Sequence, residues 1–144
     1  MSNGVEVQVS SRSMCRSILA LFAGFVVNVV LSLVTDFALQ FAGVLYMPMN
    51  DRQSALAAAY RTIYAVIGSY VVARLAPYRP VQHALFGAAM GMVIAAAGAA
   101  ATWNKNLGPH WYPVVLILTA LPTGWVGAKI WMANEKRMIQ GAHL

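Results

Sequence analysis

Residues 28–40 read NVVLSLVTDFALQ, a run in which one carboxylate, that of Asp36, stands among mostly apolar side chains. On its N-terminal side the apolar character continues, and no formally charged residue occurs between positions 17 and 35. A membrane-spanning helix needs about 20 consecutive, predominantly apolar residues. The stretch therefore predicts a transmembrane helix that carries an acid within its apolar length.

The composition of the whole chain agrees with this prediction. Of the 144 residues, 60% are hydrophobic and 10% are charged, whereas about 25% are charged in an ordinary soluble domain. A soluble fold of this size could not bury so much apolar surface. The formal net charge is +6, but the basic residues lie in short clusters between apolar runs. This pattern favours anionic lipid headgroups over nucleic acid as the partner of the basic residues.

Four apolar segments are long enough to span a bilayer. They predict an all-α, integral membrane domain over residues 14–132, with four transmembrane helices at about 17–45, 54–75, 81–102 and 111–131. The first segment is too long for the apolar core of a signal peptide, about 7 to 15 residues, and is expected to be an uncleaved span. We expect residues 1–13 to form a polar, disordered cytoplasmic arm and residues 133–144 a short cytoplasmic tail.

The distribution of Lys and Arg predicts the orientation of the helices. Basic residues gather before the first span, between the second and third, and after the fourth, namely Arg12, Arg16, Arg74, Arg79, Lys129, Lys136 and Arg137. By the positive-inside rule both ends of the chain face the cytoplasm. The short connections favour an antiparallel, up-down-up-down bundle, and Pro77 and Pro80 mark the turn between the second and third helices.

The small and polar residues of the first predicted helix share one face. Counting by fours places on it Gly24, Asn28, Ser32, Asp36 and Gln40. Arg61 lies at a similar depth in the second helix, and an arginine cannot lose its proton to escape burial. The sequence therefore predicts an ion pair between Asp36 and Arg61, with further hydrogen bonds from Tyr64 and Tyr60.

Two questions about this pair stay open at the level of the sequence. In a second arrangement, Arg61 extends toward Asp51 and Asp36 is a protonated donor inside the bundle. The pair itself could serve a proton or ion relay, or it could be a structural clamp that fixes which helices are neighbours. A paired carboxylate is stabilised as the anion and keeps its charge, which favours the clamp.

Two further features concern helix packing. Gly87 and Gly91 form a GxxxG motif that Gly98 continues on about the same face. Because small residues let helix backbones approach closely, the motif predicts tight packing, either within one bundle or in a homodimer. Pro122 falls inside the fourth span, where it frees the carbonyl of Leu118 and predicts a kink; Thr123 or a close helix could satisfy that carbonyl.

The sequence contains no pattern that predicts catalysis or a cofactor. It has no paired carboxylates, no glycine-rich phosphate loop and no Ser/His/Asp group at one depth. Its only cysteine, Cys15, excludes an internal disulfide and a multi-cysteine zinc site. His83 and His110 lie at opposite ends of their spans, separated by roughly 30 Å of hydrocarbon, and cannot share a haem. We therefore predict no catalytic residue, metal or cofactor.

Several short motifs lie in or beside the predicted spans: TD at 35–36, YR at 60–61, ARLAP at 73–77, ATW at 101–103 and GPHWYP at 108–113. Through these motifs the chain resembles a family of small, uncharacterised bacterial four-span membrane proteins, over most of residues 15–130. The resemblance implies a multi-pass protein of the bacterial inner membrane and brings no catalytic residues with it.

The expected function is that of a non-enzymatic accessory or structural component of the inner membrane, in contact with lipid and with itself or another membrane protein. The alternative is a small-solute or ion transporter or channel that acts as an oligomer, with Asp36, Arg61 and Asn28 near its path. A lipid-modifying enzyme that uses His110 is a third hypothesis. The third and fourth helices supply few polar residues at mid-depth, which favours a dry core and the accessory function.

Overall fold

The fold is all-helical throughout the part of the chain that the structure describes. In this computed structural model these are residues 3–141 for the backbone and 14–141 for the side chains. The helices are α1 (Asn3–Phe41), α2 (Asp51–Leu75), α3 (Pro80–Thr102) and α4 (Trp111–Gly141). Each contains a segment that is long and apolar enough to cross a membrane. The prediction of four apolar helices is confirmed, and they indicate a multi-pass membrane protein.

The first and last helices are longer than predicted. α1 begins at Asn3, so the prediction of a disordered arm is wrong for residues 3–13. No proline lies within α1 to interrupt the helix. α4 likewise continues to Gly141, through most of the predicted tail, because residues such as Glu135 and Lys136 are good helix formers. Residues 1–2 and 142–144 lie outside the described residues.

The connections between the helices have local causes in the sequence. α1 ends at Phe41, earlier than predicted, and Gly43 follows with a positive φ of 70°, a conformation that glycine adopts without strain. α2 begins with a capping box, in which the side chains of Asn50 and Gln53 each accept a hydrogen bond from the other's backbone N–H. α3 begins at Pro80, which confirms the predicted proline turn.

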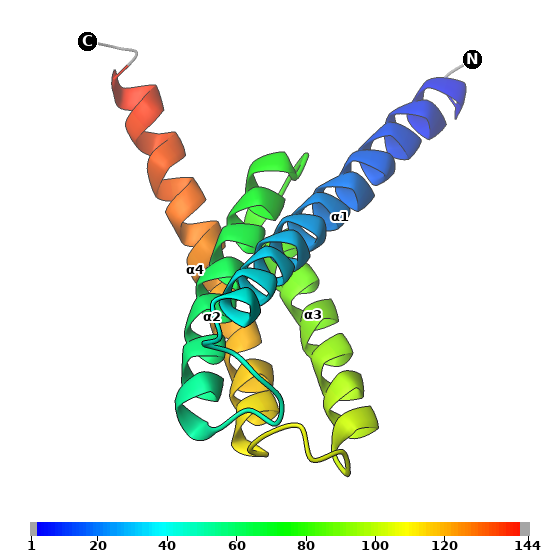
Figure 1. The fold of residues 1–144 in the computed structure, drawn as a ribbon. Helices are drawn as coiled ribbons and strands as arrows, with labels where there is room; N and C mark the ends of the chain where they lie inside the picture. Colours follow the sequence, from blue (N-terminus) through cyan, green and yellow to red (C-terminus); the bar gives the residue numbers. More distant parts are fainter. Residues whose placement is uncertain (1–2, 142–144) are drawn as a thin grey trace.

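α2 lies at the centre of the arrangement and contacts each of the other three helices. Consecutive helices run in opposite directions in the ribbon (Figure 1). The connections 42–50 and 103–110 therefore meet at one end, here called the loop end, where the N–H of Met49 donates to the carbonyl of Leu107 at 2.9 Å. The connection 76–79 lies at the opposite end, here called the turn end.

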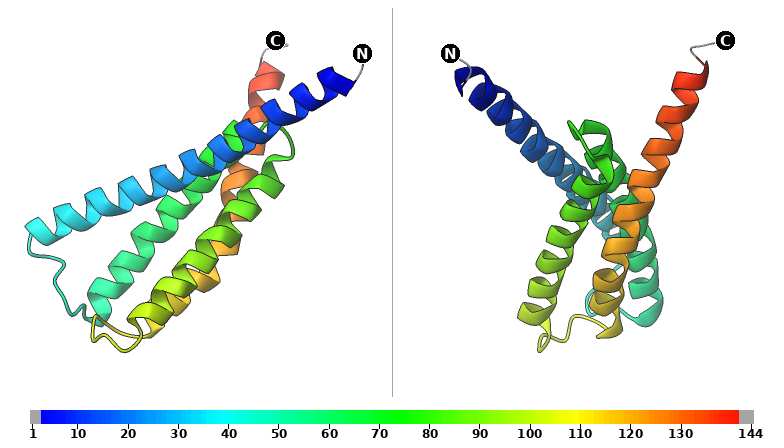
Figure 2. Two further views of the ribbon diagram at one scale, coloured as in Figure 1. Left: turned by 90° about the vertical axis from the view of Figure 1, so that its right-hand side faces the viewer. Right: turned by 180° about the vertical axis from the view of Figure 1, so that it is seen from behind.

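α1 is attached differently from the other helices. It contacts α2 and, over a shorter stretch, α3, and no described α-carbon of α1 lies within 8 Å of one in α4. Figure 2 shows α1 crossing the bundle obliquely, so that its loop-end half diverges from α3 and α4. The loop-end half of α1 therefore depends on α2 for its attachment.

The interior consists mainly of small side chains, and the large apolar side chains face outward. Ser54, Ala57, Ala73, Ala84 and Ala128 are buried, whereas Phe37 is 69% exposed and Phe22 is 64% exposed. A soluble protein of this size rarely exposes so much contiguous apolar surface. The arrangement is typical of helices that pack backbone to backbone and turn their large side chains toward lipid.

Four glycines allow these close approaches, and they are not the predicted ones. A β-carbon added at Gly24 would lie 2.6 Å from the carbonyl oxygen of Gly68 in α2, and one at Gly68 would lie 2.8 Å from the carbonyl oxygen of Gly24. One added at Gly127 would lie 2.5 Å from the carbonyl oxygen of Val66, and one at Gly124 would meet Ala88. These glycines therefore set the helix crossings.

The predicted stripe on α3 packs within the chain only at one position. A β-carbon at Gly87 would lie 3.2 Å from a methyl group of Leu21, but one at Gly91 or Gly98 would have no atom within 4 Å. Tight packing of the whole stripe inside one bundle was therefore a wrong expectation, because Gly91 lines the cavity between the helices and Gly98 a second one nearer the loops, and neither meets another helix. Packing in a homodimer stays a prediction.

The fourth helix is continuous across Pro122. The hydroxyl of Thr123 donates to the carbonyl of Ala120 at 2.8 Å. We expected Thr123 to satisfy the carbonyl of Leu118, but its hydroxyl donates to Ala120 instead. A kink at Pro122 stays a prediction.

Candidate functional site

The polar face of α1 points at protein, as the spacing by fours predicted. Asn28, Ser32 and Asp36 line a cavity between the helices, and Gln40 lines a second cavity nearer the loop end. Gly24, at the start of the same face, lies against α2. The period of the α-helix places these side chains on one face, and large apolar side chains such as Phe22 and Phe37 are turned outward.

Asp36 is the centre of a small polar cluster. Arg61 Nη2 donates to Asp36 Oδ2 at 2.5 Å, so the expected ion pair is present. The hydroxyl of Tyr60 donates to the other carboxylate oxygen, Oδ1. The second arrangement is not observed, because Asp51 instead accepts a hydrogen bond from Trp111 Nε1 at 2.8 Å. Both oxygens of the α1 carboxylate are thus held by donors from α2.

Tyr64 belongs to the same seam, but with a different partner from the one predicted. Its hydroxyl shares a hydrogen bond of 2.8 Å with the hydroxyl of Thr35. The two helices are antiparallel, so each turn toward the C-terminus of α2 meets an earlier residue of α1. Tyr60 therefore faces Asp36, and Tyr64 faces a position nearer the N-terminus of α1.

The cluster is partly shielded and holds two helices together. The Asp36 side chain is 16% exposed and the Arg61 side chain is 35% exposed. Toward the turn end, α1 is held on α2 by the close approach of the Gly24 and Gly68 backbones. Further along, His83 Nε2 of α3 hydrogen-bonds with the hydroxyl of Ser17 in α1 at 2.9 Å. An ion pair in low dielectric, with further hydrogen bonds to the carboxylate, is suited to fixing the register of α1 on α2.

On its other side, Arg61 approaches α4. The guanidinium carbon lies 5.9 Å from the centre of the Tyr112 ring, within the range of a cation–π contact. Arg61 Nε and the Tyr112 hydroxyl are both buried and have no hydrogen-bond partner among the described residues. The contact between Arg61 and Tyr112 was not predicted from the sequence. The feature of the sequence that could have indicated this contact is the position of Tyr112 at the start of the fourth span, near the loop end.

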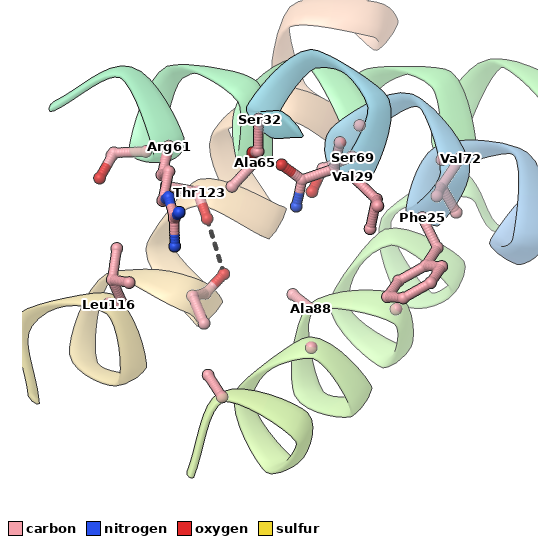
Figure 3. A pocket seen from close by; sticks show the side chains of 18 of the residues that line it. Phe25, Val29, Ser32, Arg61, Ala65, Ser69, Val72, Ala88, Leu116 and Thr123 are labelled. Atoms are coloured by element: carbon pink, nitrogen blue, oxygen red, sulfur yellow. Dashed lines mark hydrogen bonds between the residues drawn. The ribbon is translucent and has the colours of Figure 1, made fainter. Parts of the chain in front are cut away.

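A cavity of about 380 Å³, here called the central cleft, lies between α1, α2, α3 and α4. Figure 3 shows Ser32 of α1, Arg61 and Ser69 of α2 and Thr123 of α4 around it, with Ala88 of α3 on the wall opposite α1. α3 contributes only apolar side chains and glycines. The interior is therefore not filled at this depth, and its polar groups belong chiefly to α1 and α2.

A second cavity of about 360 Å³, here called the loop-end pocket, lies beneath the connections. Its walls include Trp103, Lys105 and His110 from the segment between α3 and α4, and Tyr112 from α4. Asp36 and Arg61 line both cavities. The ion pair therefore stands where the two cavities adjoin.

The histidines take part in local contacts. His110 Nε2 hydrogen-bonds with the carbonyl of Trp103 at 3.1 Å, and His83 contacts Ser17 as described. Among the described side chains, no three of His, Cys, Asp and Glu gather in a way that could hold a metal ion.

Comparison with known proteins found no match for this chain: no family model matches it, and neither does a curated protein or a solved structure. The geometry of the seam between α1 and α2, and of the two cavities beside it, is therefore the basis for assigning a function.

Proposed function

We propose that the protein is a non-enzymatic accessory or structural component of the bacterial inner membrane, and that Asp36 and Arg61 form a clamp that holds α1 on α2. The observation that carries this proposal is the engagement of both carboxylate oxygens of Asp36 by donors from α2. A fully engaged anion is a poor carrier of protons, because loading a proton would break two hydrogen bonds that stabilise the charge.

The orientation in the membrane follows from the charges at the two ends. Arg74 and Arg79 lie at the turn end, and the last turns of α4, with Lys136 and Arg137, extend past that end (Figure 1). By the positive-inside rule the turn end faces the cytoplasm and its anionic lipid headgroups, and the loop end faces outward. The resemblance to small bacterial four-span proteins supports the same location.

The proposal of an accessory function rests on a flank of the bundle that the clamp leaves uncovered. Because α1 is held by α2 and has no described contact with α4, the bundle presents an open flank between α1 and the α3–α4 pair. In a membrane such a flank is covered by lipid, by a second copy of the chain or by another membrane protein. The second and third of these would make the protein part of an assembly.

The test is native mass spectrometry of the protein extracted directly into lipid nanodiscs, without detergent. We expect recovery with another membrane protein, or as a monomer with bulk lipid, and Asp36→Ala should reduce recovery of any partner. A matched control is Asp51→Ala, which removes an acid at the loop end outside the clamp. A homo-oligomer that carries a reproducible small solute would contradict the accessory function.

A transporter or channel is the second candidate, because the central cleft and the loop-end pocket adjoin at Asp36 and Arg61. The chain has one cysteine, so a Cys15→Ser background allows Ser32→Cys to be probed alone. A water-filled path predicts rapid labelling of that cysteine by a membrane-impermeant maleimide added at the loop end. An accessory protein predicts labelling as slow as that of Phe37→Cys on the exposed apolar face of α1.

A further inference from the structure

The loop-end pocket contains two hydrogen-bond donors that the fold does not use. Arg61 Nε and the Tyr112 hydroxyl are buried, have no partner among the described residues, and belong to side chains that line this pocket. A buried donor without a partner costs about 1 to 3 kcal/mol, and more when it is charged. Both side chains line the same cavity, so a small rotation of either would bring its unpaired donor to an acceptor bound there.

The charges of the pocket show what kind of acceptor fits. Its lining contains two cationic side chains, Arg61 and Lys105, and one anionic side chain, Asp36. Both oxygens of Asp36 already accept hydrogen bonds from α2. One positive charge is therefore left over in the pocket, where a guanidinium is well suited to bind an oxyanion. The N-terminus of α4, which includes Tyr112, adds a further favourable potential for an anion.

Much of the remaining lining is apolar, and Gln40, Thr102 and His110 are its further polar residues. Leu45, Met49, Leu107 and Leu116 supply the apolar side chains, and Gly98 is among the small residues that α3 contributes. A ligand that is only an anion would leave these walls uncovered. An apolar chain attached to the anion would cover them.

We propose that the loop-end pocket binds a phosphate group, with Arg61, Tyr112 and Lys105 as its donors, and that the apolar wall takes the chain of a phosphate-bearing amphiphile. The same phosphate chemistry could come from a lipid headgroup or from free phosphate. The site shares Arg61 with the clamp but does not depend on the proposed accessory function, because the clamp uses Arg61 Nη2 and leaves Nε unpaired.

The probe is dioctanoyl phosphatidic acid, added to the full-length protein in neutral detergent, with bound ligand counted by native mass spectrometry. We expect saturable binding at one site per chain. Tyr112→Phe and Lys105→Gln should each weaken the affinity by about tenfold, since each removes one donor to a charged acceptor. Arg52→Gln is the matched control, because it removes a cation at the same end of the molecule but outside the pocket, and it should leave the affinity unchanged.

Two further ligands identify the source of the phosphate. Dioctanoylglycerol has the same chains without the phosphate, and inorganic phosphate has no chains. Competition by inorganic phosphate that is lost in Tyr112→Phe would support the site and identify free phosphate as sufficient. Failure of inorganic phosphate to compete would identify the amphiphile. Equal binding of dioctanoylglycerol, or equal losses in Arg52→Gln and Lys105→Gln, would overturn the proposal.

Discussion

The two interfaces on opposite sides of α2 are built from different chemistry. Toward α4, the approach is backbone to backbone at Gly127, with Val66 and Tyr70 against it. Toward α1, the same kind of approach occurs at Gly24, but in the loop-end half Asp36 and the residues around it take over. Lipid tails are as apolar as the helices, so helix association needs either close packing or polar bonds. Where α1 diverges and close packing is lost, polar bonds replace it.

The largest expected effect is loss of the clamp. Asp36→Ala and Arg61→Ala should each lower the free energy of unfolding by about 3 to 5 kcal/mol, because each leaves an uncompensated charge. The double variant should lose less than the sum of the two. A double-mutant cycle on the unfolding free energy in bicelles measures this coupling. Strictly additive losses would show that the ion pair does not hold α1 on α2.

The next effect concerns the second bond to the carboxylate. Tyr60→Phe removes the hydroxyl that donates to Asp36 and keeps the ring, so it should cost about 1.5 to 3 kcal/mol, as expected for a hydrogen bond to a charged group. The same unfolding measurement applies. A loss that persists unchanged in the Asp36→Ala background would show that the hydroxyl does not act through the carboxylate.

The interface with α4 is tested by adding one methyl group. Gly127→Ala places a β-carbon 2.5 Å from the carbonyl oxygen of Val66, and such overpacking should cost about 1 to 3 kcal/mol. Gly91→Ala is the matched control, since its β-carbon meets no atom within 4 Å, and it should be neutral or slightly stabilising as a monomer. If Gly91→Ala alone weakened the protein and did so only at high concentration, the homodimer prediction for α3 would gain support.

The smallest effect is expected at Tyr64. Tyr64→Phe removes a hydrogen bond between two neutral hydroxyls, and such bonds between membrane helices average about 0.6 kcal/mol. The difference between Tyr60→Phe and Tyr64→Phe, measured under one condition, therefore reports how much the charge of Asp36 contributes to the seam. Equal losses for the two variants would contradict a special role for the carboxylate.

The ion pair between Asp36 and Arg61 could be predicted because the sequence offered so few partners for Arg61. Asp36 was the only acid inside an apolar segment that could reach Arg61, and helical periodicity placed it on a face of small and polar residues. The distinction between Tyr60 and Tyr64 required the register of two antiparallel helices, which the sequence does not contain. The spacing of the tyrosines shows only that they share a face.

The glycines could not be predicted in the same way. GxxxG at Gly87 and Gly91 predicted tight packing, within one bundle or in a homodimer, but the close approaches within the chain occur at glycines outside this motif, such as Gly24 and Gly127. Which glycine meets another backbone depends on the crossing angle and depth of two helices, and these arise from all their side chains together. The cavities were missed for the same reason, since a cavity is a property of how several helices fit.

The clamp also has a consequence for how the chain enters the membrane during synthesis. A charged side chain within a spanning helix costs up to about 2.5 to 3.5 kcal/mol on insertion scales, the value at the helix centre, and α1 and α2 each bring one. Because Asp36 and Arg61 belong to consecutive helices joined by a short connection, each cost is offset once the second helix has left the ribosome. The first two helices are therefore expected to insert as a hairpin, before α3 and α4 exist to support them.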